Sequence, residues 1–206
     1  MNNNKKSRSQ QKREDILKAA MQVFREKGVQ ATSMDQLAET AKVSKRTVYN
    51  HFDSKETLVM SLLHELWEQF MLRASVEYVP DTPIAEQLGA LIDLEINMMC
   101  DEDFFTVARL AIGHCFYSTE KMRMQMERIR GQETALQRWL RAACADGKFH
   151  IDDIDFAADQ IGNLLKGILF WPVLLCDDPA PTAETRLQAK EQTVMMFMSR
   201  YASEQV

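Results

Sequence analysis

Apolar residues recur at helical spacing along the N-terminal third of the chain. Between residues 9 and 27 they fall on a single stripe, and Gly28 is a natural stop at its end. Two short amphipathic segments follow within residues 33–52, and a longer one is predicted over 55–78. The members of the first stripe are Ile16, Leu17, Ala20, Val23 and Phe24. This pattern predicts a cluster of short helices followed by a long one.

The rest of the chain keeps the same periodicity. We expect five further helices, at about 84–99, 103–116, 118–145 with a soft break at Gly131, 154–176 with a bend or end at Pro172, and 183–203. The sequence has no strand-like alternation of useful length and no internal repeat. The predicted fold class is therefore all-α.

Residues 32–55, TSMDQLAETAKVSKRTVYNHFDSK, contain the two short helices and a tight turn between them. Ser33 is an N-cap candidate for the first of these helices, and Gln36 stands where it could complete a capping box. Ser44 is the corresponding candidate for the second helix, and Ser54 for the helix that follows. The spacing of these caps predicts three successive helix starts within a short segment.

The second short helix, 45–52, has one small apolar side. Val48 and Phe52 lie four residues apart on it and are expected to face the core. The positions left outside are rich in hydrogen-bonding groups, namely Lys45, Arg46, Thr47, Tyr49, Asn50 and His51. A short helix with a dense polar face suits the major groove of DNA, whereas packing for stability alone does not explain so many exposed donors.

Charge is divided unevenly along the 206 residues, whose net charge is −5. Residues 1–55 carry 12 Lys and Arg against 6 Asp and Glu, whereas the remainder carries 13 against 24. Basic segments bind phosphates through a salt-dependent attraction, so only the N-terminal part is expected to contact DNA. Residues 1–8 are expected to be a disordered basic arm, which either reaches along the DNA or is a solvated tail.

Residues 28–58, with VSKRTVYNHFDSKETL at their centre, resemble the DNA-binding segment of TetR-family transcriptional regulators. Segments 104–116 and 155–175, the latter containing LLKGILFWPVLL, resemble the AcrR/AefR-type C-terminal domains of that family. In that branch an acidic residue is common where this chain has His114. The resemblance implies an N-terminal three-helix DNA-binding domain with a helix-turn-helix, joined to a larger helical domain for ligand binding and dimerisation.

These observations divide the chain into three parts. After the arm at 1–8, the helix-turn-helix DNA-binding domain is expected at 9–54, and the ligand-binding and dimerisation domain at 55–206. Arg46 can pair with guanine O6 and N7, Asn50 is a second base-reading candidate, and Thr47 could contact a thymine methyl group or a phosphate. The complete set of predicted DNA-binding residues is Thr32, Ser33, Ser44, Lys45, Arg46, Thr47, Tyr49, Asn50, His51 and Lys55.

Phosphate contacts are expected for several members of this set. The family resemblance implies them for Lys45, Tyr49, His51 and Lys55. Thr32 and Ser33 stand where the N-terminus of a helix can meet a phosphate.

Two segments of the C-terminal half, 161–175 and 194–201, are too apolar for the surface of a monomer. They either form a four-helix interface between two subunits, as in TetR-family dimers, or belong to the core of a single chain. A homodimer would present two recognition helices to the half-sites of a palindromic operator.

Thirteen methionines and many aromatic residues favour an adaptable apolar interior. Sparse polar groups in such an interior are typical of a site for a small hydrophobic or amphipathic ligand, although each residue could instead belong to an ordinary core. The candidate ligand-binding residues are Phe70, Asn97, Phe105, Arg109, His114, Phe116, Trp139, Asn163 and Trp171.

The sequence contains no pattern typical of a catalytic or metal site. It has no nucleophile elbow, no glycine-rich phosphate loop and no His/Cys/Asp cluster at ligand spacing, so we predict no enzyme activity, metal or cofactor. Asp93 and Glu95 are expected to be solvated or salt-bridged. The four cysteines are interpreted as reduced core residues, with redox sensing as an alternative: Cys100, Cys115, Cys144 and Cys176.

A membrane span and a secretory signal are also missing from the sequence, which favours a cytoplasmic protein. The predicted function is a ligand-responsive DNA-binding transcriptional repressor that acts as a homodimer on a palindromic operator. The alternative is a DNA-bound activator or protein-recruiting regulator without a small-molecule ligand.

Overall fold

The regular secondary structure of the described residues is helical. The structure is a computed structural model that describes residues 7–29, 31–73, 76–115, 133–176 and 178–203. The chain forms two compact units, Met1–Leu66 with Thr106–Glu127, and Trp67–Phe105 with Arg128–Val206. The predicted all-α fold class is confirmed. Within the helices, some side chains lie outside the described set, namely those of Trp67, residues 70–73, Leu110 and residues 113–115.

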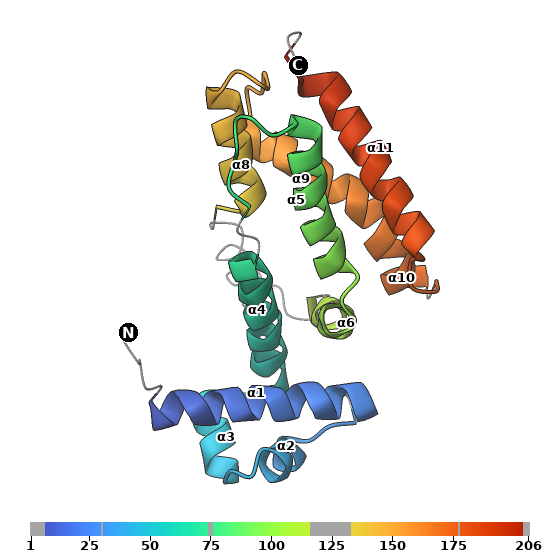
Figure 1. Ribbon diagram of the computed structural model, residues 1–206. Coiled ribbons are helices and arrows are strands. Elements are labelled where there is room, and N and C mark those ends of the chain that lie inside the picture. The colour runs from blue at the N-terminus through green and yellow to red at the C-terminus, as the bar shows by residue number, and fades with distance from the viewer. Residues whose placement is uncertain (1–6, 30, 74–75, 116–132, 177, 204–206) are drawn as a thin grey trace. The chain divides into compact units, whose positions relative to one another are not determined.

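The first unit contains the N-terminal cluster of short helices (Figure 1). The predicted stripe of the first helix lies in the core of this unit, where each of its five members is at most 4% exposed. Leu37, Val48 and Leu58 bring the next three helices into the same cluster. The helices are α1 (Arg8–Lys27), α2 (Met34–Thr40), α3 (Lys45–His51) and the beginning of α4 (Lys55–Arg73).

This shared core is what keeps α2 and α3 folded. Each has seven residues, which is too short for a helix to be stable in water by itself. Full burial of a leucine or valine side chain contributes about 1.5–3 kcal/mol, so Leu37 and Val48 supply the stability that helix propensity does not.

Serine hydroxyls cap the helices of this unit. Ser7 and Gln10 form a complete capping box at the start of α1. Ser33, Ser44 and Ser54 each accept the amide three residues ahead, as predicted. At Ser33 the structure shows only this half of the predicted capping box. Each such cap contributes about 1 kcal/mol and fixes the residue at which its helix begins.

The second unit is a helical assembly built around α5. Figure 1 shows α11 running beside α5, and α8 lies against α9. The core includes Leu88, Trp139, Ile161 and Phe197, each at most 4% exposed. The elements are the end of α4, α5 (Ile84–Met99), the start of α6 (Glu102–Cys115), α8 (Ala135–Ala145), α9 (Ile154–Leu165), the π-helix η1 (Lys166–Phe170), α10 (Trp171–Cys176) and α11 (Ala183–Tyr201).

Helix α4 is shorter than the sequence pattern predicted. It ends at Arg73, so the prediction of one helix over 55–78 is wrong at its C-terminal end. Residues 76–83, which we call the strap, are irregular and lead into α5. The apolar stripe of α4 could not reveal this end, because the strap is held by residues of α5 and α8.

Hydrogen bonds fix the strap at both of its ends. Tyr78 donates its phenolic hydrogen to Asp146 Oδ2 at 2.5 Å. Gln87 binds Val79 in both directions, because its Nε2 donates to the Val79 carbonyl and its Oε1 accepts the Val79 amide. The same Nε2 donates to the carbonyl of Thr82 at 2.9 Å. The strap is therefore part of the second unit although most of its residues are exposed.

The predicted helix 154–176 is divided into three elements. Helix α9 ends at Leu165, and η1 separates it from α10, which begins at Trp171. Pro172 has no amide hydrogen and is tolerated in the first turn of α10. The Trp171 amide donates to the carbonyl of Lys166, five residues earlier, which is the wider π pattern. The irregularity therefore lies one turn before the proline rather than at it.

Only the last part of the predicted helix 118–145 lies among the described residues. There α8 begins at Ala135, and Thr134 with Gln137 forms its capping box. Residues 133–134 are not helical, so the predicted helix is interrupted immediately before Ala135. The stretch around Gly131, where a soft break was expected, lies outside the described residues.

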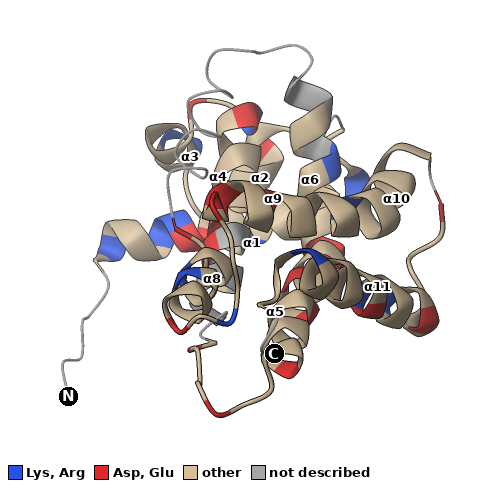
Figure 2. Cartoon of the chain, turned by 90° about the horizontal axis from the view of Figure 1, so that it is seen from above, with Lys and Arg blue, Asp and Glu red and all other residues tan. Residues whose placement is uncertain are grey.

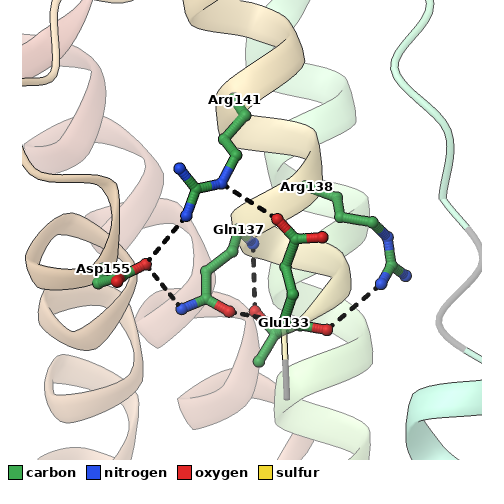
Figure 3. A network of polar contacts seen from close by, with 6 residues as sticks. Glu133, Gln137, Arg138, Arg141 and Asp155 are labelled. Carbon is green, nitrogen blue, oxygen red and sulfur yellow. Dashed lines mark hydrogen bonds and ion pairs between the residues drawn. The ribbon is translucent and has the colours of Figure 1, made fainter. Parts of the chain in front are cut away.

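A network of polar contacts joins α8 to the first turn of α9 (Figure 3). Gln137 Nε2 donates to Asp155 Oδ1 at 3.0 Å, and the same carboxylate oxygen lies 3.4 Å from a terminal nitrogen of Arg141. Arg141 also donates its Nε hydrogen to Glu133 at 3.1 Å. Exposed ion pairs contribute little free energy individually, so this network mainly fixes the angle between the two helices.

The prediction that the cysteines are core residues is wrong for one of them, and Cys100 and Cys144 pack partly buried against the core of the second unit. Cys176 is exposed near the end of α10, so its interpretation as a core residue is wrong. Cys100 and Cys144 are half-buried, and desolvation by burial raises the pKa of both thiols. The side chain of Cys115 lies outside the described set.

Candidate nucleic-acid interface

Helix α3 turns one apolar residue inward and its polar residues outward. Val48 is fully buried, and Phe52, directly after the helix, is 1% exposed, which confirms the orientation predicted for both. Arg46 and Asn50, one helical turn apart, are exposed, and 52% of Tyr49 is exposed. The first unit thus presents a short helix whose outer face can enter a groove.

The hydroxyl groups at the start of α3 are engaged within the helix. Ser44 Oγ accepts the Thr47 amide at 3.1 Å and lies 2.8 Å from Thr47 Oγ1. A DNA contact by either residue stays a prediction, and it would have to share or replace these hydrogen bonds.

Lys45, the first residue of α3, is paired with a carboxylate of α2. Its Nζ lies 2.5 Å from Asp35 Oδ2, and the two side chains are 65% and 55% exposed. Sequence reasoning missed this pair, because the periodicity of one helix carries no information about a partner ten residues away on another.

Two predicted phosphate-binding residues form hydrogen bonds within the first unit. Thr32, which is 2% exposed, donates its hydroxyl hydrogen to the Gly28 carbonyl at 2.7 Å. Lys55 Nζ donates to the Val29 carbonyl at 3.0 Å. Gly28 has a φ of 74°, and both bonds satisfy carbonyl groups at the turn that follows α1. These bonds support a structural role for Thr32, and the phosphate contacts of Thr32, Lys55 and the exposed cap Ser33 stay predictions.

Basic residues of α1 lie in the same unit as α3. Figure 2 shows Lys and Arg positions on both helices. The guanidinium of Arg13 lies 5.4 Å from the ring centroid of Phe52, within the range of a cation–π contact. The His51 ring is also next to Phe52, with 6.3 Å between the centroids. Arg13 of α1 thus lies against the residue that follows α3.

The candidate ligand-binding residues do not converge on one described site. Phe105 is half-buried and stacks on Phe170, with 5.3 Å between the ring centroids. Two side chains, those of Phe70 and His114, and the whole of Phe116 lie outside the described set. Four candidates are exposed on the single chain, namely Asn97, Arg109, Asn163 and Trp171.

Trp139 belongs to the core of the second unit. It is 1% exposed, and its ring makes edge contacts with Tyr78 and Phe149. Its indole N–H donates to Gln87 Oε1 at 3.3 Å, so its one polar atom is satisfied inside the chain. Sequence reasoning did not single out Gln87, although a polar residue beside Leu88 in the apolar pattern of α5 was an available signal.

Two carboxylates of α5 have different environments. Asp93 Oδ2 lies 2.5 Å from Lys190 Nζ, in line with the expected salt bridge. Glu95 differs, because desolvation by burial raises the pKa of its carboxyl group while the charge of Lys166 acts in the opposite direction. Glu95 is therefore a partly desolvated acid facing the beginning of η1, and not a solvated surface group.

The C-terminal helices expose large apolar side chains. Helices α9, η1, α10 and α11 hold seven of the nine large hydrophobic residues that are exposed among those described, with exposures from 40% to 65%. Exposed apolar side chains that adjoin one another mark an interaction site, whereas single ones are normal on a protein surface. We call these seven residues the apolar face: Phe156, Ile168, Trp171, Leu175, Leu187, Met195 and Met196.

No metal centre is found in the part of the chain that the structure describes, where no three His, Cys, Asp or Glu side chains are grouped to hold an ion. The helices described there also include none with the length and hydropathy of a membrane span.

A cluster of short helices with an exposed polar helix after a tight turn defines a helix-turn-helix DNA-binding protein. Two family descriptions match the chain: "Bacterial regulatory proteins, tetR family" over residues 16–62, and "AefR-like transcriptional repressor, C-terminal domain" over residues 86–203. The chain belongs to the TetR family of bacterial transcriptional regulators. The family resemblance inferred from the sequence is therefore confirmed.

Solved structures agree with this assignment. A TetR-family transcriptional regulator from Pseudomonas syringae pv. tomato is 35% identical, with a TM-score of 0.75, covering 93% of this chain and 97% of that one. The flavonoid-responsive regulator FrrA is 26% identical, with a TM-score of 0.71, covering 94% of this chain and 98% of that one.

Curated relatives match over shorter segments. YuxN of Bacillus subtilis, an uncharacterised helix-turn-helix regulator, is 29% identical over 68% of this chain and 43% of its own length. AcrR of Shigella flexneri is 29% identical over 60% of this chain and 50% of its own length. The chain thus matches less than two thirds of the length of these relatives.

Proposed function

We propose that this chain is a ligand-responsive transcriptional repressor that acts as a homodimer on a palindromic operator. The observation that carries the proposal is the outer face of α3, where Arg46 and Asn50 are exposed over a buried Val48. Such a face can read base edges in the major groove, while basic residues around it contact phosphates. The repressor would act in the cytoplasm, because the bacterial chromosome lies there.

Arg46 is the side chain on which sequence discrimination should depend most. Selection of bound duplexes from random sequence would first define the operator. Arg46→Ala should then weaken operator binding by about 1–3 kcal/mol per half-site and relax selectivity, because a bidentate contact to guanine is lost. Lys18→Ala removes one exposed positive charge from α1 and is the control. An Arg46→Ala protein with unchanged selectivity would refute the assignment.

The apolar face supports the homodimer. Seven large side chains at 40–65% exposure would be costly to leave in water, and a second copy of the same helices could cover them. Met196→Glu should shift the protein toward monomer in light-scattering measurements, whereas Gln22→Glu, an exposed change on α1 in the first unit, should not. Identical monomeric masses for wild type and both variants would exclude the homodimer.

Ligand response would act through the spacing of the two recognition helices. A dimer that fits an operator holds them about 34 Å apart, one turn of DNA. A ligand in the second unit would bind more tightly to a dimer whose spacing no longer fits the operator. The difference between the ligand's binding free energies for the two spacings is typically about 1–3 kcal/mol. Operator affinity should therefore fall in the presence of the right small molecule.

The similarity to a flavonoid-responsive regulator suggests which molecules to test first. Flavonoids and a cell extract would be titrated into the protein–operator complex, with the operator-bound fraction as the readout. If neither changes the affinity for the operator, the alternative function gains support. That alternative is a DNA-bound activator, or a regulator that recruits a protein partner through the apolar face.

A further inference from the structure

The Lys45–Asp35 pair links α3 to α2 on the side of the first unit that carries the predicted DNA contacts. The 2.5 Å separation of Lys45 Nζ and Asp35 Oδ2 makes it a direct charge-assisted hydrogen bond. Both side chains are more than half exposed, so the pair lies where a phosphate could approach.

Both partners are anchored by their own helices. Asp35 lies in the first turn of α2, whose start is fixed by the Ser33 cap. Lys45 is the first residue of α3, whose start is fixed by the Ser44 cap. Since the two helix starts are set independently of the ion pair, the carboxylate is held within reach of the lysine by the fold itself.

We propose that Asp35 is a positioning residue for DNA binding, which holds the Lys45 ammonium against α2 and keeps it from acting as a full phosphate contact. The proposal rests on the phosphate contact proposed for Lys45. A DNA phosphate that binds this ammonium has to replace the Asp35 carboxylate, or has to approach with the carboxylate still present. Either way Asp35 lowers the affinity for duplex DNA.

This effect is independent of DNA sequence. Phosphate contacts position a protein on DNA and carry no base information, so Asp35 should lower the affinity for operator and for unrelated duplex by the same factor. Each phosphate neutralised by a protein cation steepens the dependence of log affinity on log salt by about 0.9. Removing the carboxylate should therefore add up to about 0.9 to that slope for each bound subunit.

The test is a double-mutant cycle with Asp35→Asn and Lys45→Gln, measured on a duplex selected by the wild-type protein and on its scrambled version. Fluorescence anisotropy titrations between about 50 and 200 mM salt give the slopes. One added contact corresponds to an additional affinity loss of about 3.5-fold per bound subunit over this range. Asp35→Glu retains the charge and should retain the wild-type slope. Circular dichroism and thermal unfolding confirm that each variant is folded.

Glu39 supplies the matched control, because it is an exposed carboxylate one turn further along α2. Asp35→Asn should steepen the slope when Lys45 is present and have no such effect in the Lys45→Gln background. Glu39→Gln should have the same small effect in both backgrounds.

Three results would overturn the inference. If Asp35→Asn acts equally with and without Lys45, the carboxylate acts only through its general charge. If it changes the ratio of operator to scrambled affinity, Asp35 affects base reading. If the selection yields no duplex that the wild-type protein binds at about 50 mM salt, the proposed DNA-binding function fails together with the inference, which separates that failure from the other two.

Discussion

Gln87 is the polar centre of the second unit, and replacing it with methionine tests whether it holds the strap. The side chain is 6% exposed. Its Nε2 donates to the carbonyls of Val79 and Thr82, and its Oε1 accepts the Val79 amide and the Trp139 indole N–H. Methionine has a similar length and volume but no strong hydrogen-bonding group, so Gln87→Met removes these four bonds while creating little cavity.

The expected loss of stability depends on whether each former hydrogen-bond partner of Gln87 can bind water after the substitution. The Trp139 N–H is buried and cannot reach water, so leaving it unpaired should cost about 1–3 kcal/mol. Val79 is 48% exposed, so the backbone groups of the strap can bind water instead, and each lost bond costs less. Together these terms predict a destabilisation of about 2–4 kcal/mol.

Urea unfolding at one fixed protein concentration measures this loss. Circular dichroism and tryptophan fluorescence should be followed together, because coincident transitions are needed for a two-state treatment of a chain with two units. Gln137→Met is the matched control, since Gln137 binds the half-buried Thr134 amide and the exposed Asp155 carboxylate of Figure 3, where water can replace it, and its loss should cost about 1 kcal/mol. A Gln87→Met protein destabilised no more than this control would refute the reasoning.

Three further outcomes are expected. Burial, together with the hydrogen bond to Asp146, raises the pKa of Tyr78 from 10.0 to about 12, so an ultraviolet titration of Tyr78→Phe should lose one tyrosine that ionises well above pH 10.0. The stability from this raised pKa is fully present below pH 10.0 and is lost as the pH rises through 12, so the stability advantage of wild type over Tyr78→Phe should shrink across that window. Burial raises the pKa of the Glu95 carboxyl group, so its ionised form destabilises the folded state. Glu95→Gln should therefore increase stability at neutral pH but not below pH 4.5, the ordinary pKa of the group. An equal effect at both pH values would contradict this. Exposed Cys176 should react with a thiol reagent faster than half-buried Cys100 and Cys144, and Cys176→Ser should remove one fast-reacting thiol.

The first unit could be predicted closely because its signals are local. The stripe of α1, the stop at Gly28 and the serine caps each act within a few residues. The predicted helices 9–27 and 45–52 agree within one residue with α1 and α3, and α2 begins directly after its predicted cap Ser33. Val48 and Phe52 were correctly assigned to the core because a short helix with two apolar positions has only one face that can be buried.

The strap, by contrast, depends on partners far away in sequence. Tyr78 bonds to Asp146, and Gln87 bonds to Trp139, across separations of 68 and 52 residues. Such contacts compete with the continuation of α4, and no periodicity within α4 could show that the helix ends at Arg73. The ion pair of Asp35 was not predicted for the same reason, since its partner Lys45 belongs to the next helix.

The candidate ligand site was the least predictable part, because it was inferred from residue type. A polar residue within an apolar segment can lie off the buried stripe, and one or two positions are enough to place it in solvent. Asn97, next to the buried Ile96 and Met98, and Asn163, two residues after the buried Ile161, are both exposed for this reason. Composition therefore identified an apolar interior but not which side chains line it.

Helices α4 and α6 are described helices that contribute residues to both units. The first turns of α4 are built into the first unit, because Leu58 and Leu62 are buried in its core and Lys55 bonds to the turn after α1. A shift of α4 relative to α1 would expose those leucines, at about 1.5–3 kcal/mol for each, which is comparable to the whole coupling energy available to a ligand. If the proposed ligand response holds, an effector should therefore leave the fold of the first unit, including α3, intact.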